Sequence, residues 1–105
     1  MNFNDYLTSF PAVDHLSGLN VLDESGTLIH HIPAVAGKFG SLKLYNALAE
    51  RFESLLNAEA AAQGLTWFAE HVADAKAHSG KHPNVDLLLL VQAEQKQYRL
   101  QAVAV

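Results

Sequence analysis

The residues best suited to chemistry gather between positions 67 and 84, where one indole, three imidazoles and two carboxylates occur together. His71 and Asp74 are three residues apart, so on a helix their side chains can meet. A carboxylate beside an imidazole fixes the ring tautomer and raises its basicity, which suits proton transfer or metal binding. His82 follows in a Gly-Lys-His-Pro loop and could fold back toward the same place. This stretch is therefore the first candidate for a site.

The same stretch offers weak candidates for a divalent metal, namely His71, Asp74 and His78. Imidazole and carboxylate are both ordinary ligands of Zn²⁺. The two histidines, however, are seven residues apart, which on a helix separates them by about 10 Å along the axis. The His-Glu-x-x-His pattern of zinc proteases is also absent. We therefore expect no resident metal and no other cofactor.

A second group of residues has the chemistry of anion recognition. Lys81, His82, the helix start near Asn84 and Lys38 from an earlier loop could receive a phosphate or a carboxylate, because a helix N-terminus favours negative charge. The same holds for the start of an earlier predicted helix, where Ser41 is the expected N-cap. The anion-binding candidates there are Lys38, Gly40 and Ser41. This loop does not have the spacing of a P-loop.

Both groups also have a purely structural interpretation, which we favour. Asp74, His71 and the loop 81–84 can hydrogen-bond one another and fix a turn between helices. The segment 37–41 can be a plain connection between a strand and a helix. Nucleophilic catalysis has little support, since no serine lies in a nucleophile-elbow context. Binding is therefore expected rather than enzymatic activity.

The element that must position the first group is a long helix predicted to begin after Asn57, its N-cap, and to end near Gly80. Its interior Gly64 indicates a kink, a close helix crossing or a break. At about 100° per residue, four side chains fall within a band roughly 60° wide, opposite the apolar stripe: Trp67, His71, Asp74 and His78. A solvated face would carry Lys, Glu and Gln instead. Something should therefore cover this band: another segment of the chain, a second subunit or a ligand.

The other elements follow from hydrophobic periodicity and from turn residues. We expect a helix over 2–10, capped by Asn2 or Asn4, and a hairpin with strands 18–24 and 27–33 in which His30 and His31 face opposite sides. Next come an amphipathic helix over 42–56 and a short helix capped by Asn84 and containing Leu87–Leu90, for which a strand is the alternative. The last element is a strand over 97–105 that pairs with the hairpin. The predicted fold class is α+β, with a small antiparallel sheet of about three strands (hairpin plus C-terminal strand) packed against three or four helices.

Length and composition limit the possible functions. The chain has 105 residues, so one domain over 1–105 is expected. Half of the residues are hydrophobic and 17% are charged, below the usual quarter, which favours a homodimer or another buried partner surface. The net charge of −4 and the lack of a basic stripe make nucleic acid an unlikely partner.

Other classes are excluded by what the sequence lacks. There is no cysteine, which rules out disulfides, Fe–S clusters and thiol catalysis. The first ten residues do not have the pattern of a signal peptide, and no apolar run approaches the roughly 20 residues that span a bilayer. The sequence thus predicts a cytoplasmic protein that is not embedded in a membrane.

Two stretches carry a resemblance to a known family: GKFGSLKLYNALAERF at 37–52 and AEHVADAKAHSGKHPNVD at 69–86. Together with the hairpin before them, they resemble a small bacterial family of about this length, known only as a domain of unknown function. The resemblance implies a cytoplasmic protein without an assigned activity. Its matching segments include Gly37, Gly40, His71, Asp74, Gly80, Lys81, His82, Pro83 and Asn84. His78 is not part of that pattern, which weakens any site that needs three histidines.

These observations support two functional hypotheses. In the first, the face formed by Trp67, His71 and Asp74 mediates self-association or protein binding, most simply in a homodimer. In the second, His71, Asp74, Lys81 and His82 surround a site for a small molecule, an anion or a divalent metal, which could carry hydrolytic or proton-transfer chemistry. The ligand itself is not identified by the sequence.

Overall fold

The computed structural model describes residues 1–105 and contains one antiparallel sheet of four strands in the order β2-β1-β4-β3. The central strand β1 (Leu16–Leu22) pairs with β2 (Leu28–Pro33) on one side and with β4 (Tyr98–Ala104) on the other. The short β3 (Leu55–Leu56) completes the sheet beside β4. The predicted α+β class, the hairpin and its pairing with the C-terminal strand are confirmed. The sheet has one strand more than expected.

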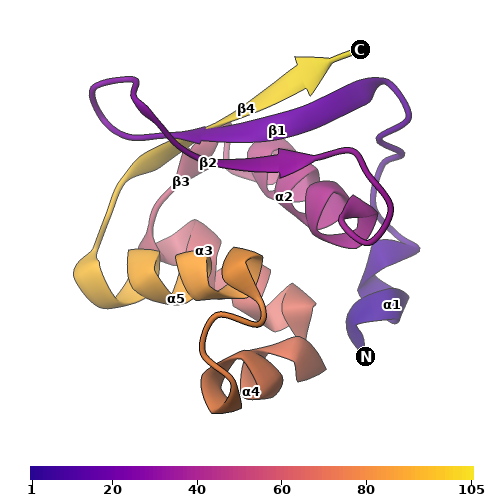
Figure 1. Ribbon diagram of the computed structural model, residues 1–105, viewed down its shortest axis with the longest axis vertical. Coiled ribbons are helices and arrows are strands. Elements are labelled where there is room, and N and C mark those ends of the chain that lie inside the picture. The colour runs from indigo at the N-terminus through magenta and orange to yellow at the C-terminus, as the bar shows by residue number, and fades with distance from the viewer.

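Five helices lie on one side of this sheet (Figure 1). Helix α2 (Phe39–Arg51) lies nearest the strands, and α3 (Ala58–Phe68) and α5 (Pro83–Glu94) form the next layer. Helix α4 (Glu70–Ala77) is at the end of the molecule farthest from the sheet, whereas α1 (Phe3–Leu7) packs against α2 and α3 at about the level of α3 and α5. None of the five is long and apolar enough to span a membrane.

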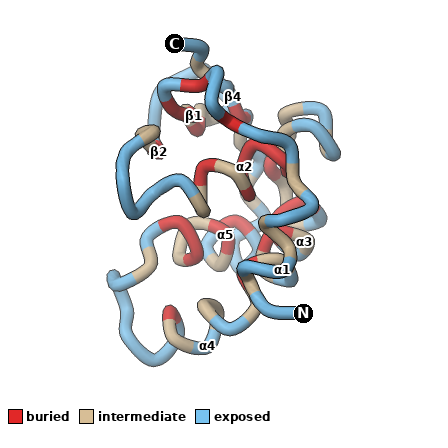
Figure 2. Tube along the Cα trace, turned by 90° about the vertical axis from the view of Figure 1, so that its right-hand side faces the viewer, coloured by how far each residue is buried: buried red, intermediate tan, exposed pale blue.

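The hydrophobic core lies between the sheet and the inner helices. Strand alternation directs Leu19 and Val21 of β1 toward the helices, where both are fully buried. Buried residues are concentrated in β1, α2, α3 and α5, whereas α4 buries only Ala75 and α1 buries none (Figure 2). A fully buried leucine or valine contributes about 1.5–3 kcal/mol, so stability is concentrated on the sheet side of the molecule.

The predicted long helix is wrong, because the chain breaks at Ala69. This residue has φ 52° and ψ −117°, and α3 ends before it while α4 begins after it. Periodicity gave no sign of the break, since alanine is the best helix former. Trp67 belongs to α3 and Asp74 to α4, so these side chains do not form one continuous helical band. Gly64 marks a close helix crossing instead: a Cβ there would be 2.6 Å from Leu88 Cδ1 of α5.

Other boundaries also differ from the prediction. The second helix ends at Arg51 rather than Leu56, because Glu53 and Ser54 adopt positive φ and turn the chain into β3. It begins at Phe39 with Lys38 as N-cap, so Ser41 lies inside the first turn. Helix α5 has His82 rather than Asn84 as N-cap. The N-terminal helix ends at Leu7, while the expected cap at Asn2 is confirmed by a capping box with Asp5.

Candidate anion-binding cleft

A cleft of about 470 Å³ opens where five segments meet: α1, the start of α2, the end of α3, α4 and the start of α5. This volume lies within the range of small-molecule sites. The cleft brings together the two anion-binding groups that the sequence placed far apart. Its lining residues are Phe3, Asn4, Leu7, Gly37, Lys38, Phe39, Gly40, Ser41, Phe68, His71, Lys81, His82, Pro83, Asn84 and Val85.

The lining of this cleft carries basic groups and no acidic ones. Two lysines and two histidines contribute to it, but none of the 11 aspartates and glutamates does. The chain as a whole has a net charge of −4, so the cleft differs in sign from the protein around it. Lys38 forms no ion pair with a carboxylate elsewhere in the chain. Such a cavity attracts anions.

One wall is the start of α2. The N-cap Lys38 makes no side-chain capping bond, and the backbone N–H groups of Phe39, Gly40 and Ser41 donate to no protein acceptor. These are unsatisfied donors of a helix N-terminus, where the helix dipole also favours negative charge. Gly40 allows α1 to close over them: a Cβ there would be only 3.0 Å from the Phe3 ring.

The start of α5 forms the facing wall. His82 also makes no side-chain capping bond, Pro83 has no N–H to satisfy, and the Asn84 N–H donates to no protein acceptor. Asn84 is held from behind by two long-range hydrogen bonds. Tyr45 Oη donates to its carbonyl at 2.6 Å, and His30 Nε2 lies 2.6 Å from its Oδ1. Burial raises the pKa of Tyr45 far above its usual value, so this hydroxyl stays a donor.

The Asn84 amide therefore has one end bound and one end free. The residue is only 7% exposed, and its Nδ2 has no hydrogen-bond partner in the protein. Every fully buried polar side-chain atom in the structure does have a partner. Nδ2 therefore keeps some exposed surface, and Asn84 is a residue that lines the cleft. It is a fixed neutral donor in an otherwise basic cavity.

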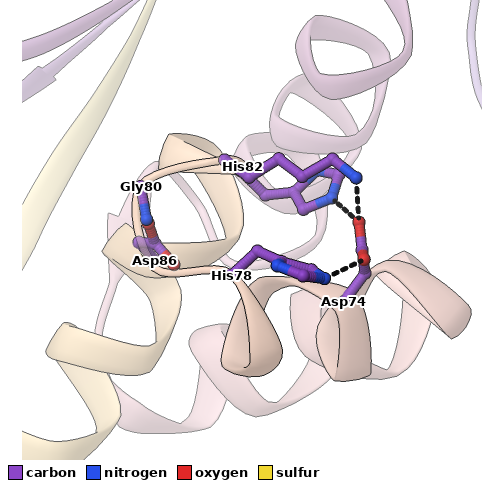
Figure 3. A network of polar contacts seen from close by, with 6 residues as sticks. Asp74, His78, Gly80, His82 and Asp86 are labelled. Atoms are coloured by element: carbon purple, nitrogen blue, oxygen red, sulfur yellow. Dashed lines mark hydrogen bonds and ion pairs between the residues drawn. The ribbon is translucent and has the colours of Figure 1, made fainter.

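Behind the cleft, Asp74 gathers the basic side chains of the loop after α4 (Figure 3). Its Oδ2 lies 2.5 Å from His82 Nε2 and 3.1 Å from Lys81 Nζ, while His78 Nε2 approaches Oδ1 at 3.8 Å. The hydrogen bond from His82, followed by that from Lys81, lowers the pKa of Asp74 from 3.8 to about 2. Asp74 does not itself line the cleft. It orients His82 and Lys81 and acts as their counter-ion, so Lys38 is the lysine of the lining that has no carboxylate partner.

His71 does not bond to Asp74, although the two lie on the same helix. Its ring packs edge-on against Phe3 at 4.7 Å and lies 5.3 Å from the His82 ring. Phe3 is fixed in turn by stacking on Phe68 and by its N–H, which donates to Glu70 Oε1 at 2.8 Å. This bond lowers the pKa of Glu70 and fastens α1 to the start of α4. His71 thus contributes an imidazole to the cleft beside that of His82.

The structure gives no support for the weak metal candidates. No group of three or more His, Asp or Glu side chains has the arrangement needed to hold a metal ion, and His71 is not part of the cluster around Asp74. Asp74 and His78 approach each other only at 3.8 Å.

Trp67 lies apart from this site. Its ring is half-buried and packs against Phe10 at 4.6 Å, so a segment of the same chain covers it in part. It does not line the cleft. A segment of the same chain thus covers part of Trp67, while a second subunit or a ligand over the remaining surface stays a prediction.

Sequence reasoning missed several residues that shape the cleft. Phe3 and Phe39 line it, while Tyr45 and His30 hold Asn84 in place. Only His30 had given a signal: strand alternation put it on the same face as Ile32, and the structure buries that face, where an imidazole needs a polar partner. That partner is Asn84 on α5, and His31 on the other face bonds to Asn20.

Comparison with protein-family models gives a match that covers nearly the whole chain. A family model described as an uncharacterized protein conserved in bacteria (DUF2322) matches residues 3–102. The chain belongs to the DUF2322 family. The resemblance seen in two stretches of the sequence is thereby confirmed. Residues 3–102 include every side chain that lines the cleft, so the site lies within the DUF2322 match. Searches of curated proteins and of solved structures gave no match.

Proposed function

We propose that this protein binds a small anionic ligand in the cleft between α2 and α5. The observation that carries the proposal is the lining itself, which holds Lys38, Lys81, His71 and His82 without a single carboxylate in an acidic chain. Surface charges on such a protein are expected to be mixed, or negative on balance. A concave basic region instead favours an anion as its occupant.

Two helix starts strengthen this interpretation. The first N–H groups of α2 have no protein acceptor, so they are free to donate to a ligand. A phosphate or carboxylate in the cleft would satisfy them and receive the positive end of the helix dipole. Lys38, whose ammonium has no carboxylate partner, would supply the charge.

Asp74 supports the site from behind. Its bond to His82 Nε2 fixes the ring, and its ion pair with Lys81 restrains the flexible lysine stem. Less side-chain entropy is then lost when an anion binds, because these groups are already ordered. The protein is expected to act by binding rather than catalysis.

The test is a titration at low ionic strength with inorganic phosphate, phenyl phosphate and phenylacetate, followed by calorimetry and by thermal unfolding. At least one of these anions should raise the melting temperature in proportion to the logarithm of its concentration. The Lys38→Gln variant should weaken that binding roughly tenfold, because a charged hydrogen bond is lost.

Lys96→Gln is the matched control, since it removes the same charge beyond the far end of α5. It should bind as the wild type does. The proposal is wrong if none of the three anions binds, or if both lysine variants lose affinity equally.

Self-association through Trp67, His71 and Asp74 stays a prediction with weaker support. The break at Ala69 separates Trp67 from the other two residues, and Phe10 packs on its ring. A homodimer and a cytoplasmic location are likewise still expectations from composition. Sedimentation over a range of protein concentrations tests the dimer directly.

A further inference from the structure

The cleft is much larger than an inorganic anion requires. At about 30 Å³ for each liquid water, a volume of about 470 Å³ corresponds to roughly fifteen waters. Part of its wall is apolar: Phe3, Leu7 and Phe68 line it on the α1 and α3 side. At the start of α2, Phe39 also lines the cleft and is 48% exposed. An apolar ligand group would cover this ring.

The polar donors of the cleft come from separate directions. The free N–H groups of Phe39, Gly40 and Ser41 come from α2, and Asn84 Nδ2 comes from α5, where His30 holds the other end of the amide. A planar carboxylate has two oxygens in one plane. A phosphate monoester has three terminal oxygens in a tetrahedral array, so it offers one more acceptor than a carboxylate does to the donors of α2, Asn84 and a lysine.

We propose that the ligand is a phosphate monoester of an apolar or aromatic alcohol. Its phosphate lies between the start of α2 and the Asn84 amide, and its organic part packs against Phe39 and the aromatic wall of α1 and α3. Asn84 is the specificity-determining residue, because its free N–H₂ is a neutral donor at a fixed place. This inference rests on the proposed anion-binding function and narrows it to one ligand class.

The first experiment compares three ligands on the wild-type protein at equal ionic strength: phenyl phosphate, inorganic phosphate and phenylacetate. Phenyl phosphate should bind about tenfold more tightly than either of the others, because it alone satisfies both the donors and the apolar wall. If phenylacetate binds as tightly as phenyl phosphate, and Lys38→Gln weakens both, the anion site stands and the phosphate monoester is wrong. If none binds, both proposals fail.

Two variants test separately the contacts of the organic part of the ligand and those of its phosphate. Phe39→Ala should remove most of the advantage of phenyl phosphate over inorganic phosphate, since the exposed ring contributes to the rim of the cleft rather than to the core. Asn84→Asp keeps the side-chain shape but replaces the donor by a negative oxygen. It should weaken both phosphates about ten- to hundredfold.

A measurement on the wild-type protein covers the case in which Asn84→Asp does not fold. The side-chain amide signals of Asn84 in a ¹⁵N spectrum should shift on addition of phenyl phosphate, while those of Asn20, which bonds to His31 and Gln101 on the far face of the sheet, should not. Unchanged Asn84 signals at saturation would overturn its assigned role.

Discussion

At the scale of single residues, Asp74 decides how the basic side chains of the cleft are presented. Its carboxylate receives His82 and Lys81 on one oxygen and faces His78 on the other. Because Asp74 lies behind the cleft, it acts as an internal counter-ion that orders these groups while leaving the lining free of acid. A ligand anion would compete with it for Lys81, whose ammonium is partly exposed.

The stability of the folded protein should depend on the ionisation of the Asp74 carboxyl group. Its pKa is depressed to about 2 in the folded protein, against an ordinary 3.8, so its contribution is present above about pH 4. That contribution is lost as the pH falls from about 4 to about 2. Thermal unfolding should therefore show that Asp74→Asn lowers the melting temperature at pH 7 and that its difference from wild type narrows below pH 4.

Asp23 and Glu70 also have lowered pKa values, but they titrate in both proteins and cancel in the difference. A difference between wild type and variant that stays constant from pH 7 to pH 2 would contradict the role assigned to Asp74.

Local chemistry located both halves of the site, and Lys38 was the only residue of the first half that the sequence grouped with the second. Lys38, Gly40 and Ser41 were chosen for one helix start, and Lys81, His82 and Asn84 for another. Each choice rested on local chemistry, which a single sequence displays. The approach of α2 to α5 depends on long-range packing, such as the bond from Tyr45 to Asn84, and no local pattern encodes it. For His71 and Asp74 the local pattern predicted a contact that is absent. Their helical spacing permits it, but His71 packs against Phe3 and Asp74 bonds to His82.

At the scale of elements, periodicity predicted the hairpin, α5 and the last strand, and it failed where a break left the pattern unchanged. Leu55 and Leu56 continue the apolar spacing of α2, although they form a strand beside β4. Ala69 continues the alanine-rich helix, although it separates α3 from α4. In both places the chain adopts positive φ at residues other than glycine, and these residue types do not predict such a conformation.

The strain at Ala69 gives a test of the break. A non-glycine residue in such a conformation costs about 1–3 kcal/mol, whereas glycine adopts it readily. Ala69→Gly should therefore stabilise the protein by about 1 kcal/mol, after the entropy of the unfolded chain is included. Urea unfolding measures this change.

Ala62→Gly is the control for that variant. Ala62 is exposed in the interior of α3, where glycine should destabilise the protein by about 1 kcal/mol. If both variants are destabilised equally, the helix continues through position 69 and the separation of α3 from α4 is wrong.

At the scale of the whole molecule, the cleft lies where the fold is least tightly packed. The sheet, α2, α3 and α5 contain nearly all of the buried residues, while α1 has none and α4 has only Ala75 (Figure 2). Two walls of the cleft are thus made by elements that little hydrophobic burial holds in place. Regions of this kind open with the smallest free energies, and binding sites are commonly drawn from them. The rigid side of the cleft supplies the helix starts, and the looser side can adapt to the ligand.

Hydrogen exchange should show that α1 and α4 open more readily than the well-packed sheet and α2. Amides of α1 and α4 should exchange well before those of β1 and α2, because their opening exposes little apolar surface. Saturating phenyl phosphate should slow exchange in α1 and α4 by about tenfold or more, since a bound ligand must leave before the walls can open. Fast-exchanging amides of the hairpin turn at 23–27, which does not line the cleft, should be unaffected.

The Lys38→Gln variant, measured at the same ligand concentration, should show little of the slowing. Slowing confined to the hairpin turn, or equal slowing in Lys38→Gln, would place the ligand somewhere other than this cleft.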